Sequence, residues 1–127
     1  MKKSPEWPRT ASLINERDLQ FMLYEFFDAE SLIKRERYQD HDRQTFNEVV
    51  NTAKAIAEKH FLPIRQKLDS HQPSFDGKNV HLIPELKPAI DAVIASGISS
   101  ATADYQSNGM QLPPIIASAA STYLTVA

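Results

Sequence analysis

Apolar side chains recur along this chain at the spacing of an α-helix, and this periodicity constrains the fold more than any other feature. Residues three or four positions apart lie on one face of a helix. Strand-like alternation is nearly absent, and only 3 of the 127 residues are glycine. We therefore predict an all-α fold, an incomplete helical bundle with one short hairpin-like connector. The length is typical of one domain with a modest core.

The first predicted helix covers Glu16–Phe27. Its cap is Asn15 or Asp18, since both side chains can accept a hydrogen bond from a free backbone N–H. We expect a single apolar stripe along this helix to face the core, and a short helical turn to follow over Glu30–Ile33. The stripe consists of Leu19, Met22, Leu23, Phe26 and Phe27.

The second predicted helix has the most regular pattern, and Asp42 is a suitable N-cap for it. Pro63 lies inside the run and predicts a kink or break near Phe61–Leu62, because proline removes a backbone hydrogen bond and clashes with the preceding turn. In the connector Ser70–Leu82, the pair Asp76-Gly77 predicts a small hairpin. The apolar face of the helix consists of Phe46, Val49, Val50, Ala53, Ile56, Ala57, Phe61, Ile64 and Leu68.

A third helix is predicted to begin near Pro84, a residue suited to the first helical position, and to end at Gly97. Pro88 is expected to confine regular hydrogen bonding to Ala89 onward. The expected buried face consists of Leu86, Ile90, Val93 and Ile94.

The last helix is predicted to start at Pro113 or Pro114, after a polar loop over Ser99–Gln111. Neither a charge nor a glycine closes it before Ala127. We therefore expect its apolar face to meet a surface outside this chain. That face consists of Ile115, Ile116, Ala119, Tyr123 and Leu124.

Composition argues against several classes of partner. The net charge is -2, the pI is about 6.1, and basic residues alternate with acids, as in Lys34-Arg35-Glu36-Arg37. Such a surface argues against nucleic-acid binding. The longest apolar run, Leu112–Ala127, contains two prolines and is shorter than the roughly 20 residues of a membrane span. Met1–Thr10 lacks the apolar core of a secretory signal, and the absence of cysteine fits a cytoplasmic protein.

No residue set has the spacing of a known catalytic, cofactor-binding or metal site. The four histidines, His41, His60, His71 and His81, lack metal-ligand spacing. We interpret Asp40-His41-Asp42 as a helix cap beside an exposed histidine, and His60 as a packed, hydrogen-bonded residue. A glycosidase-like pair among Glu25, Asp28 and Glu30 stays open, although surface acids are common. We assign no catalytic, cofactor-binding or metal-ligating residue to this chain.

Several segments, in order, resemble the N-terminal part of the long bacterial acyl-CoA dehydrogenases. The resemblance covers essentially the whole chain. It begins in an N-terminal extension and continues through the start of the first core helix to a glycine-containing turn before a further helix. The segments are Arg17–Glu25 with Asp28-Ala29-Glu30, Asp40–Phe46, Phe61–Ile64, Phe75–Leu82, the helix that ends at Gly97, and Gly109–Pro113.

The resemblance implies two parts: residues 1–38 as an extension with one amphipathic helix, and residues 39–127 as a partial N-terminal helical domain, truncated before the FAD-binding β-domain. The complete enzyme would bind FAD and oxidise the Cα–Cβ bond of an acyl-CoA thioester in fatty-acid oxidation. Its partners would be the β-domain and the C-terminal helical bundle, and homo-oligomers would be confined to the full-length form. For this chain alone the resemblance implies no bound cofactor and no activity.

One local departure concerns the turn after Tyr105, where the family usually has a Gly-Gly pair and this chain has Gln106-Ser107. A positive φ at those positions would cost roughly 1 kcal/mol each or more. A different interpretation of the chain is a free-standing helical module that holds a partner helix or a lipid-like ligand in an apolar groove.

Overall fold

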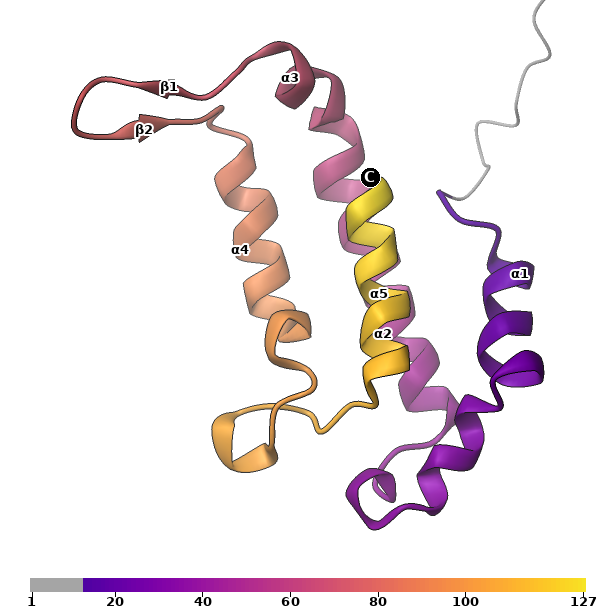
Figure 1. Cartoon of the computed structure of the whole chain (residues 1–127). Coiled ribbons are helices and arrows are strands. Elements are labelled where there is room, and N and C mark those ends of the chain that lie inside the picture. Colours follow the sequence, from indigo (N-terminus) through magenta and orange to yellow (C-terminus); the bar gives the residue numbers. More distant parts are fainter. Residues whose placement is uncertain (1–12) are drawn as a thin grey trace, which may run out of the picture.

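The computed structural model describes residues 13–127, and it is 68% helix and 3% strand. The all-α prediction is therefore confirmed at the level of fold class. α4 and the hairpin lie on one side of the molecule, α2 and α5 in the middle, and α1 on the other side (Figure 1). Every helix within residues 13–127 is too short or too polar to span a lipid bilayer. The prediction about Met1–Thr10 lies outside the described residues.

The first helix is continuous but changes its hydrogen bonding partway. It begins as α1 (Glu16–Gln20) and continues as a π-helix, η1 (Phe21–Phe26). The Asp18 backbone N–H donates to Asn15 Oδ1 at 3.1 Å, which identifies Asn15 as the cap. The predicted bounds are correct to within one residue.

The predicted apolar stripe on this helix is only partly correct: Leu19 and Leu23 pack in or against the core, and the other three residues do not. Leu23 is buried, but Met22, Phe26 and Phe27 are 43%, 65% and 54% exposed, and Tyr24 is buried instead. A π-helix bonds residue i to i+5 and so places more residues in each turn than an α-helix. Apolar positions spaced for an α-helix therefore point in different directions along η1.

Two short 3-10 turns, η2 (Ala29–Lys34) and η3 (Glu36–Tyr38), lead to α2 (Arg43–Ile56). Asp42 caps α2 as predicted. Its Oδ1 accepts from the Thr45 backbone N–H at 2.8 Å, and Thr45 Oγ1 accepts from the Asp42 N–H at 2.9 Å. Two backbone donors at the helix start are thus satisfied reciprocally.

The regular hydrogen bonding of α2 ends at Ile56, before the break predicted near Phe61–Leu62, which falls inside a longer irregular stretch. A π turn, η4 (Ala57–Phe61), and a 3-10 turn, η5 (Leu62–Ile64), separate α2 from α3 (Arg65–Ser70). Proline at residue 63 has no N–H to donate, so the chain passes through this irregular stretch before α3 begins.

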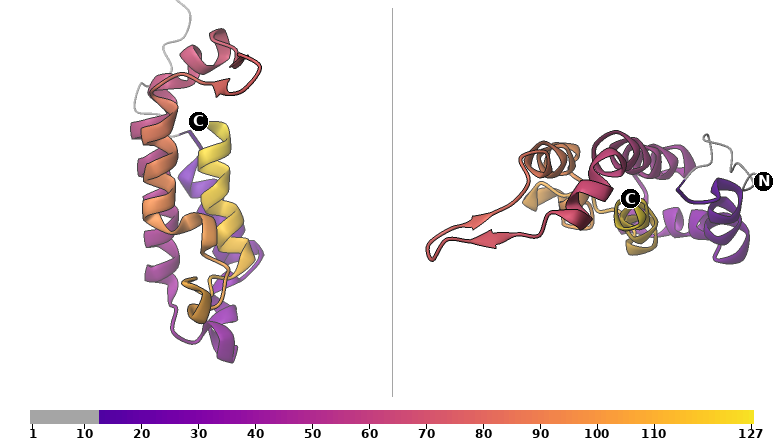
Figure 2. Two further views of the ribbon diagram at one scale, coloured as in Figure 1. Left: turned by 90° about the vertical axis from the view of Figure 1, so that its left-hand side faces the viewer. Right: turned by 90° about the horizontal axis from the view of Figure 1, so that it is seen from above.

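The predicted hairpin is present and projects away from the helices (Figures 1 and 2). β1 (Ser74–Phe75) pairs antiparallel with β2 (Val80–His81), with Phe75 opposite Val80. Gly77 adopts φ 93° at the turn, a conformation that favours glycine.

α4 (Leu86–Ser96) ends at Gly97, whose φ of 77° gives a left-handed C-cap. The helix begins at Leu86 rather than Pro84. Pro88 does not delay it, because the first N–H groups of a helix have no partner within the helix. The predicted buried face is partly wrong: Val93 packs against the core, but Ala89 is the buried residue, and Ile90 and Ile94 are 44% and 62% exposed. α4 contacts α2 and η4, and Ala92 also packs against the core.

α5 (Pro114–Val126) starts at one of the two predicted prolines and packs along α2 (Figures 1 and 2). Ile116 and Ala120 are 0% exposed, and Tyr123 is also buried. They belong to one core cluster with Phe46 and Ala53 of α2. The expectation that this apolar face needs a surface outside the chain is therefore wrong, because α2 covers it.

Candidate functional site

The loop between α4 and α5 folds back on itself and forms the most highly organised polar region of the described chain. It contains two 3-10 turns, η6 (Ile98–Ser100) and η7 (Tyr105–Ser107). The Ala101 carbonyl accepts from both Met110 N at 3.1 Å and Leu112 N at 2.9 Å. These bonds bring the two ends of the loop together next to the start of α5.

A glycine is required at residue 109 because the backbone of Ala103 lies very close to it, and not because of the φ angle of residue 109. A Cβ at this position would lie 2.0 Å from the Ala103 carbonyl oxygen. The left-handed positions of the loop are Asn108, at φ 61°, and Gln111, at φ 48°. Asparagine tolerates this conformation better than most residues. The departure at Gln106-Ser107 therefore adds no left-handed strain, since both residues have negative φ.

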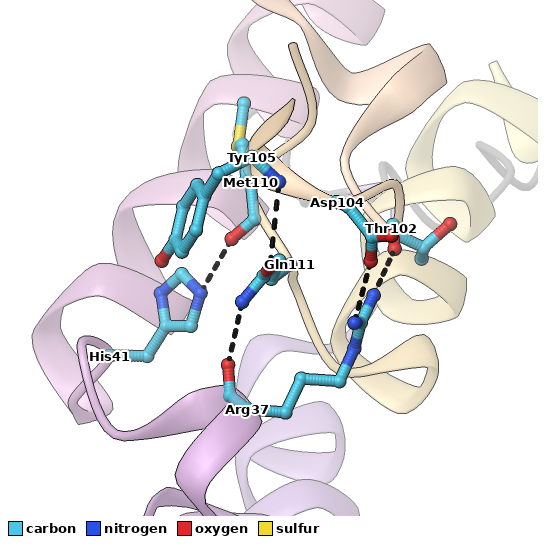
Figure 3. A network of polar contacts seen from close by, with 7 residues as sticks. All are labelled: Arg37, His41, Thr102, Asp104, Tyr105, Met110 and Gln111. Atoms are coloured by element: carbon cyan, nitrogen blue, oxygen red, sulfur yellow. Dashed lines mark hydrogen bonds and ion pairs between the residues drawn. The ribbon is translucent and has the colours of Figure 1, made fainter. Parts of the chain in front are cut away.

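Arg37, from η3, lies beside this loop and bonds to it (Figure 3). Its Nη1 lies 2.6 Å from Asp104 Oδ1, and its Nη2 donates to the Thr102 carbonyl at 3.1 Å. The side chains of Arg37 and Asp104 are 45% and 60% exposed. Solvent screens a pair this exposed, so Arg37 acts mainly by setting the position of the loop.

Gln111 links the same two segments in spite of its left-handed backbone. Its Nε2 donates to the Arg37 carbonyl at 3.1 Å, and its Oε1 accepts from Tyr105 N at 3.4 Å (Figure 3). A non-glycine residue in this region carries about 1–3 kcal/mol of strain, which surrounding contacts must offset. The two side-chain bonds of Gln111 supply such contacts.

His41 makes the third link. Its Nε2 is 2.8 Å from the Met110 carbonyl (Figure 3). The centre of its ring lies 5.8 Å from that of the Phe46 ring. His41 is half-buried, so the prediction of an exposed histidine is wrong. Asp42, beside it, is used as the cap of α2. Within residues 13–127, no group of three or more His, Cys, Asp or Glu side chains is arranged to hold a metal ion.

A groove of about 430 Å³ runs between this loop and α2. Its apolar side chains are Val49, Ile98 and Met110, and its ionisable side chains include Asp40 and Glu48. The pKa of Tyr105 is raised chiefly by burial of its hydroxyl, and the charge and hydrogen bonding of Asp40 raise this pKa further. The remaining lining residues are His41, Thr45, Thr52, Ser96 and Tyr105.

The carboxylates at the end of the first helix have separate structural environments. Glu30 Oε2 lies 3.8 Å from Arg43 Nη1, and the Arg43 guanidinium lies 4.1 Å from the centre of the Tyr24 ring. Asp28 has φ 49°, and its carbonyl accepts from Ser31 Oγ at 2.7 Å. Glu30 and Asp28 are thus engaged in an ion pair and a turn.

The other histidines lie apart from the loop. His60 is half-buried in η4. His71 Nδ1 is 3.1 Å from the Lys67 carbonyl at the end of α3, and His81 Nε2 is 2.7 Å from Asp76 Oδ2 in the hairpin. The structure therefore distributes the four histidines over four local elements.

Sequence reasoning did not identify the groove or the links from Arg37 and Gln111. These contacts join residues 65 to 74 positions apart, and no periodic pattern connects such positions. The left-handed Gln111 also has no sequence signal, because glutamine is not a residue that favours this conformation.

Comparison with known proteins identifies no relative: no family model, no curated protein and no solved structure matches this chain. Its function is therefore inferred from its residues and their geometry.

Proposed function

We propose that this chain is the N-terminal helical part of an FAD-dependent acyl-CoA dehydrogenase of the long bacterial type. The complete enzyme would act in the cytoplasm on acyl-CoA thioesters in fatty-acid oxidation. In this proposal the chain supplies packing surfaces and has no redox activity alone. The β-domain and the C-terminal bundle supply the flavin site and the base that removes the α-proton.

The observation that carries the proposal is where the family-like segments fall in the fold. Asp40–Phe46 forms the cap of α2, Phe61–Ile64 forms the break after it, and Phe75–Leu82 forms the hairpin. Gly97 caps α4, and Gly109–Pro113 closes the loop before α5. Residues at caps, breaks and tight turns determine how helices connect. The resemblance thus falls on residues that specify the order and connection of the helices.

The groove beside the α4–α5 loop is a poor fit to FAD. FAD carries a diphosphate, and the groove beside the loop is lined by the carboxylates of Asp40 and Glu48, with no lysine or arginine. Negative charge at that rim repels a diphosphate. We therefore assign no step of flavin chemistry to this chain.

Two exposed apolar surfaces support the role as a packing domain. One is on the first helix, where Phe26 and Phe27 stack edge to face at 4.8 Å in solvent. The other is on α4, where Ile90 and Ile94 are exposed. Large exposed apolar residues that gather on one element are typical of surfaces covered by another protein part. In the complete enzyme we assign that part to the two remaining domains.

The experiment is a fusion. The part of a long bacterial acyl-CoA dehydrogenase that follows the matched segment, namely the rest of its N-terminal helical domain, its β-domain and its C-terminal bundle, is joined after Ala127. Acyl-CoA-dependent reduction of an artificial electron acceptor is then measured. We expect activity in the fusion, and none in this chain or in the added domains alone. A folded fusion without activity, beside an active parent enzyme prepared in the same way, would contradict the proposal.

A second candidate function is a free-standing module for a partner helix or lipid-like ligand. One observation favours it: an open groove of about 760 Å³ is lined by Phe61, Leu62 and Leu68, with Arg65 at its edge. The coding sequence immediately after Ala127 separates the two candidates. A continuing frame that resembles a flavin-binding β-domain supports the dehydrogenase, and an unrelated neighbour supports the module.

A further inference from the structure

The groove between α2 and the α4–α5 loop combines an apolar floor with a negatively charged rim. Its volume of about 430 Å³ is within the range of roughly 300–1,000 Å³ found for small-molecule sites. Ile98 is buried at its floor, and Val49 and Met110 are half-buried beside it. These side chains offer an apolar surface to a ligand body.

Most of the polar groups in the groove already have partners within the protein. Thr45 Oγ1 donates to the Asp42 carbonyl, and Ser96 Oγ donates to the Val93 carbonyl. His41 is bonded to Met110. These groups therefore hold the walls of the groove in place.

The carboxylates at the rim retain acceptor capacity. Glu48 Oε1 accepts one bond, from Gln44 Nε2 at 3.2 Å, whereas a carboxylate has about four acceptor sites. Asp40 lies near the hydroxyl of Tyr105. The groove lining contains no lysine or arginine to neutralise either acid. Both carboxylates line the groove, so a cation bound in it would be attracted to negative charge that no basic residue of the lining offsets.

We propose that this groove binds a small organic cation: a primary ammonium attached to an apolar body. The ammonium would lie between Asp40 and Glu48, because three N–H donors match carboxylate acceptors. The apolar body would cover Val49, Ile98 and Met110. This site is separate from the flavin chemistry proposed for the complete enzyme.

The test uses phenethylamine with two analogues of similar shape, phenylacetate and phenethyl alcohol. Each is titrated into the full chain while NMR follows the methyl groups of Val49, Ile98 and Met110. We expect saturable shifts with the amine, weaker ones with the alcohol and none with the acid. Equal responses to amine and acid, or no saturable shift with the amine, would overturn the proposal.

Two variants locate the cation. Glu48→Gln and Asp40→Asn keep the size of each side chain and remove its charge, and each should weaken amine binding on the order of threefold, as expected for an exposed charge contact. Glu58→Gln removes an exposed acid outside the groove lining and should leave binding unchanged. If all three variants bind the amine as the original chain does, the proposed placement of the cation is wrong. The test needs only the isolated chain, so its failure would not affect the fusion experiment.

Discussion

Replacing Gly109 with alanine should be among the most damaging single substitutions in the loop. The added Cβ would lie 2.0 Å from the Ala103 carbonyl oxygen and 2.3 Å from its carbonyl carbon. Ordinary carbon–oxygen contacts are about 3.3 Å or longer, so the backbone segments around Gly109 and Ala103 must separate by roughly 1.3 Å. This movement strains the hydrogen bond from Gln111 N to Ala103 O, which is now 2.9 Å.

The expected loss is the sum of two effects. Overpacking typically costs about 1–3 kcal/mol, and the weakened hydrogen bond adds about 1 kcal/mol. Gly109→Ala should therefore lower the free energy of unfolding by about 2–4 kcal/mol, measured by urea denaturation with far-ultraviolet circular dichroism.

Gly77→Ala is the matched control, because a Cβ at residue 77 meets nothing within 4 Å. Its positive φ alone predicts a loss of about 1–2 kcal/mol, limited to the projecting hairpin. If Gly109→Ala destabilises the chain no more than Gly77→Ala, the close contact with Ala103 does not explain the glycine.

Three further predictions concern the core, a cap and pH. Phe46→Ala should lower the free energy of unfolding by about 3–5 kcal/mol, because Phe46 is 0% exposed. The control Ile94→Ala, at an exposed site, should change it by no more than about 0.5 kcal/mol. Equal losses for the two variants in thermal or urea unfolding would contradict the assigned core. Asp42→Ala should cost about 1 kcal/mol by removing the cap of α2, and an unchanged urea midpoint would contradict this role. The pKa of Asp76 is lowered from 3.8 chiefly by the Asn79 backbone N–H, then by His81 and the Lys78 N–H. A lowered folded-state pKa gives stability that is present above the unfolded value and lost as pH falls through the folded one. NMR shifts of the Lys78 and Asn79 amides, which donate to Asp76 Oδ1, should therefore change as pH falls below about 3.8. Asp76→Ala should remove this transition, and the same titration in both proteins would contradict it.

The sequence predicts most of the helix boundaries because their signals are local. Asp42 caps α2, Pro63 lies in the irregular stretch between α2 and α3, and Asp76-Gly77 turns the hairpin. Each depends on one or two residues and on backbone chemistry that neighbouring residues determine. Such features can be predicted without knowing the tertiary structure.

Predictions about which face is buried were less successful because burial depends on packing. The change to π hydrogen bonding in η1 turned Phe26 and Phe27 toward solvent. On α4, Ala89 is buried and Val93 packs against the core, whereas Ile90 and Ile94, which are equally apolar, are exposed. Periodicity gives a helix its apolar side but does not specify which neighbour covers it.

The candidate site was the hardest part to predict. Arg37 and Gln111 approach each other across most of the chain, and the groove forms only after α2, α4 and the loop have packed. The sequence indicated that Gly109 and the following prolines form a turn before α5. It gave no indication that Asp40 and Glu48 share a groove with Tyr105.

Bound flavin per polypeptide, read from the visible absorbance of the purified protein, tests the central proposal most directly. The isolated chain and its fusion to the β-domain and C-terminal bundle are saturated with FAD, freed of unbound cofactor and compared. We predict a flavin spectrum near one FAD per chain in the fusion, and none in the isolated chain. Stoichiometric flavin on the isolated chain, or a folded fusion that remains colourless, would contradict the proposal.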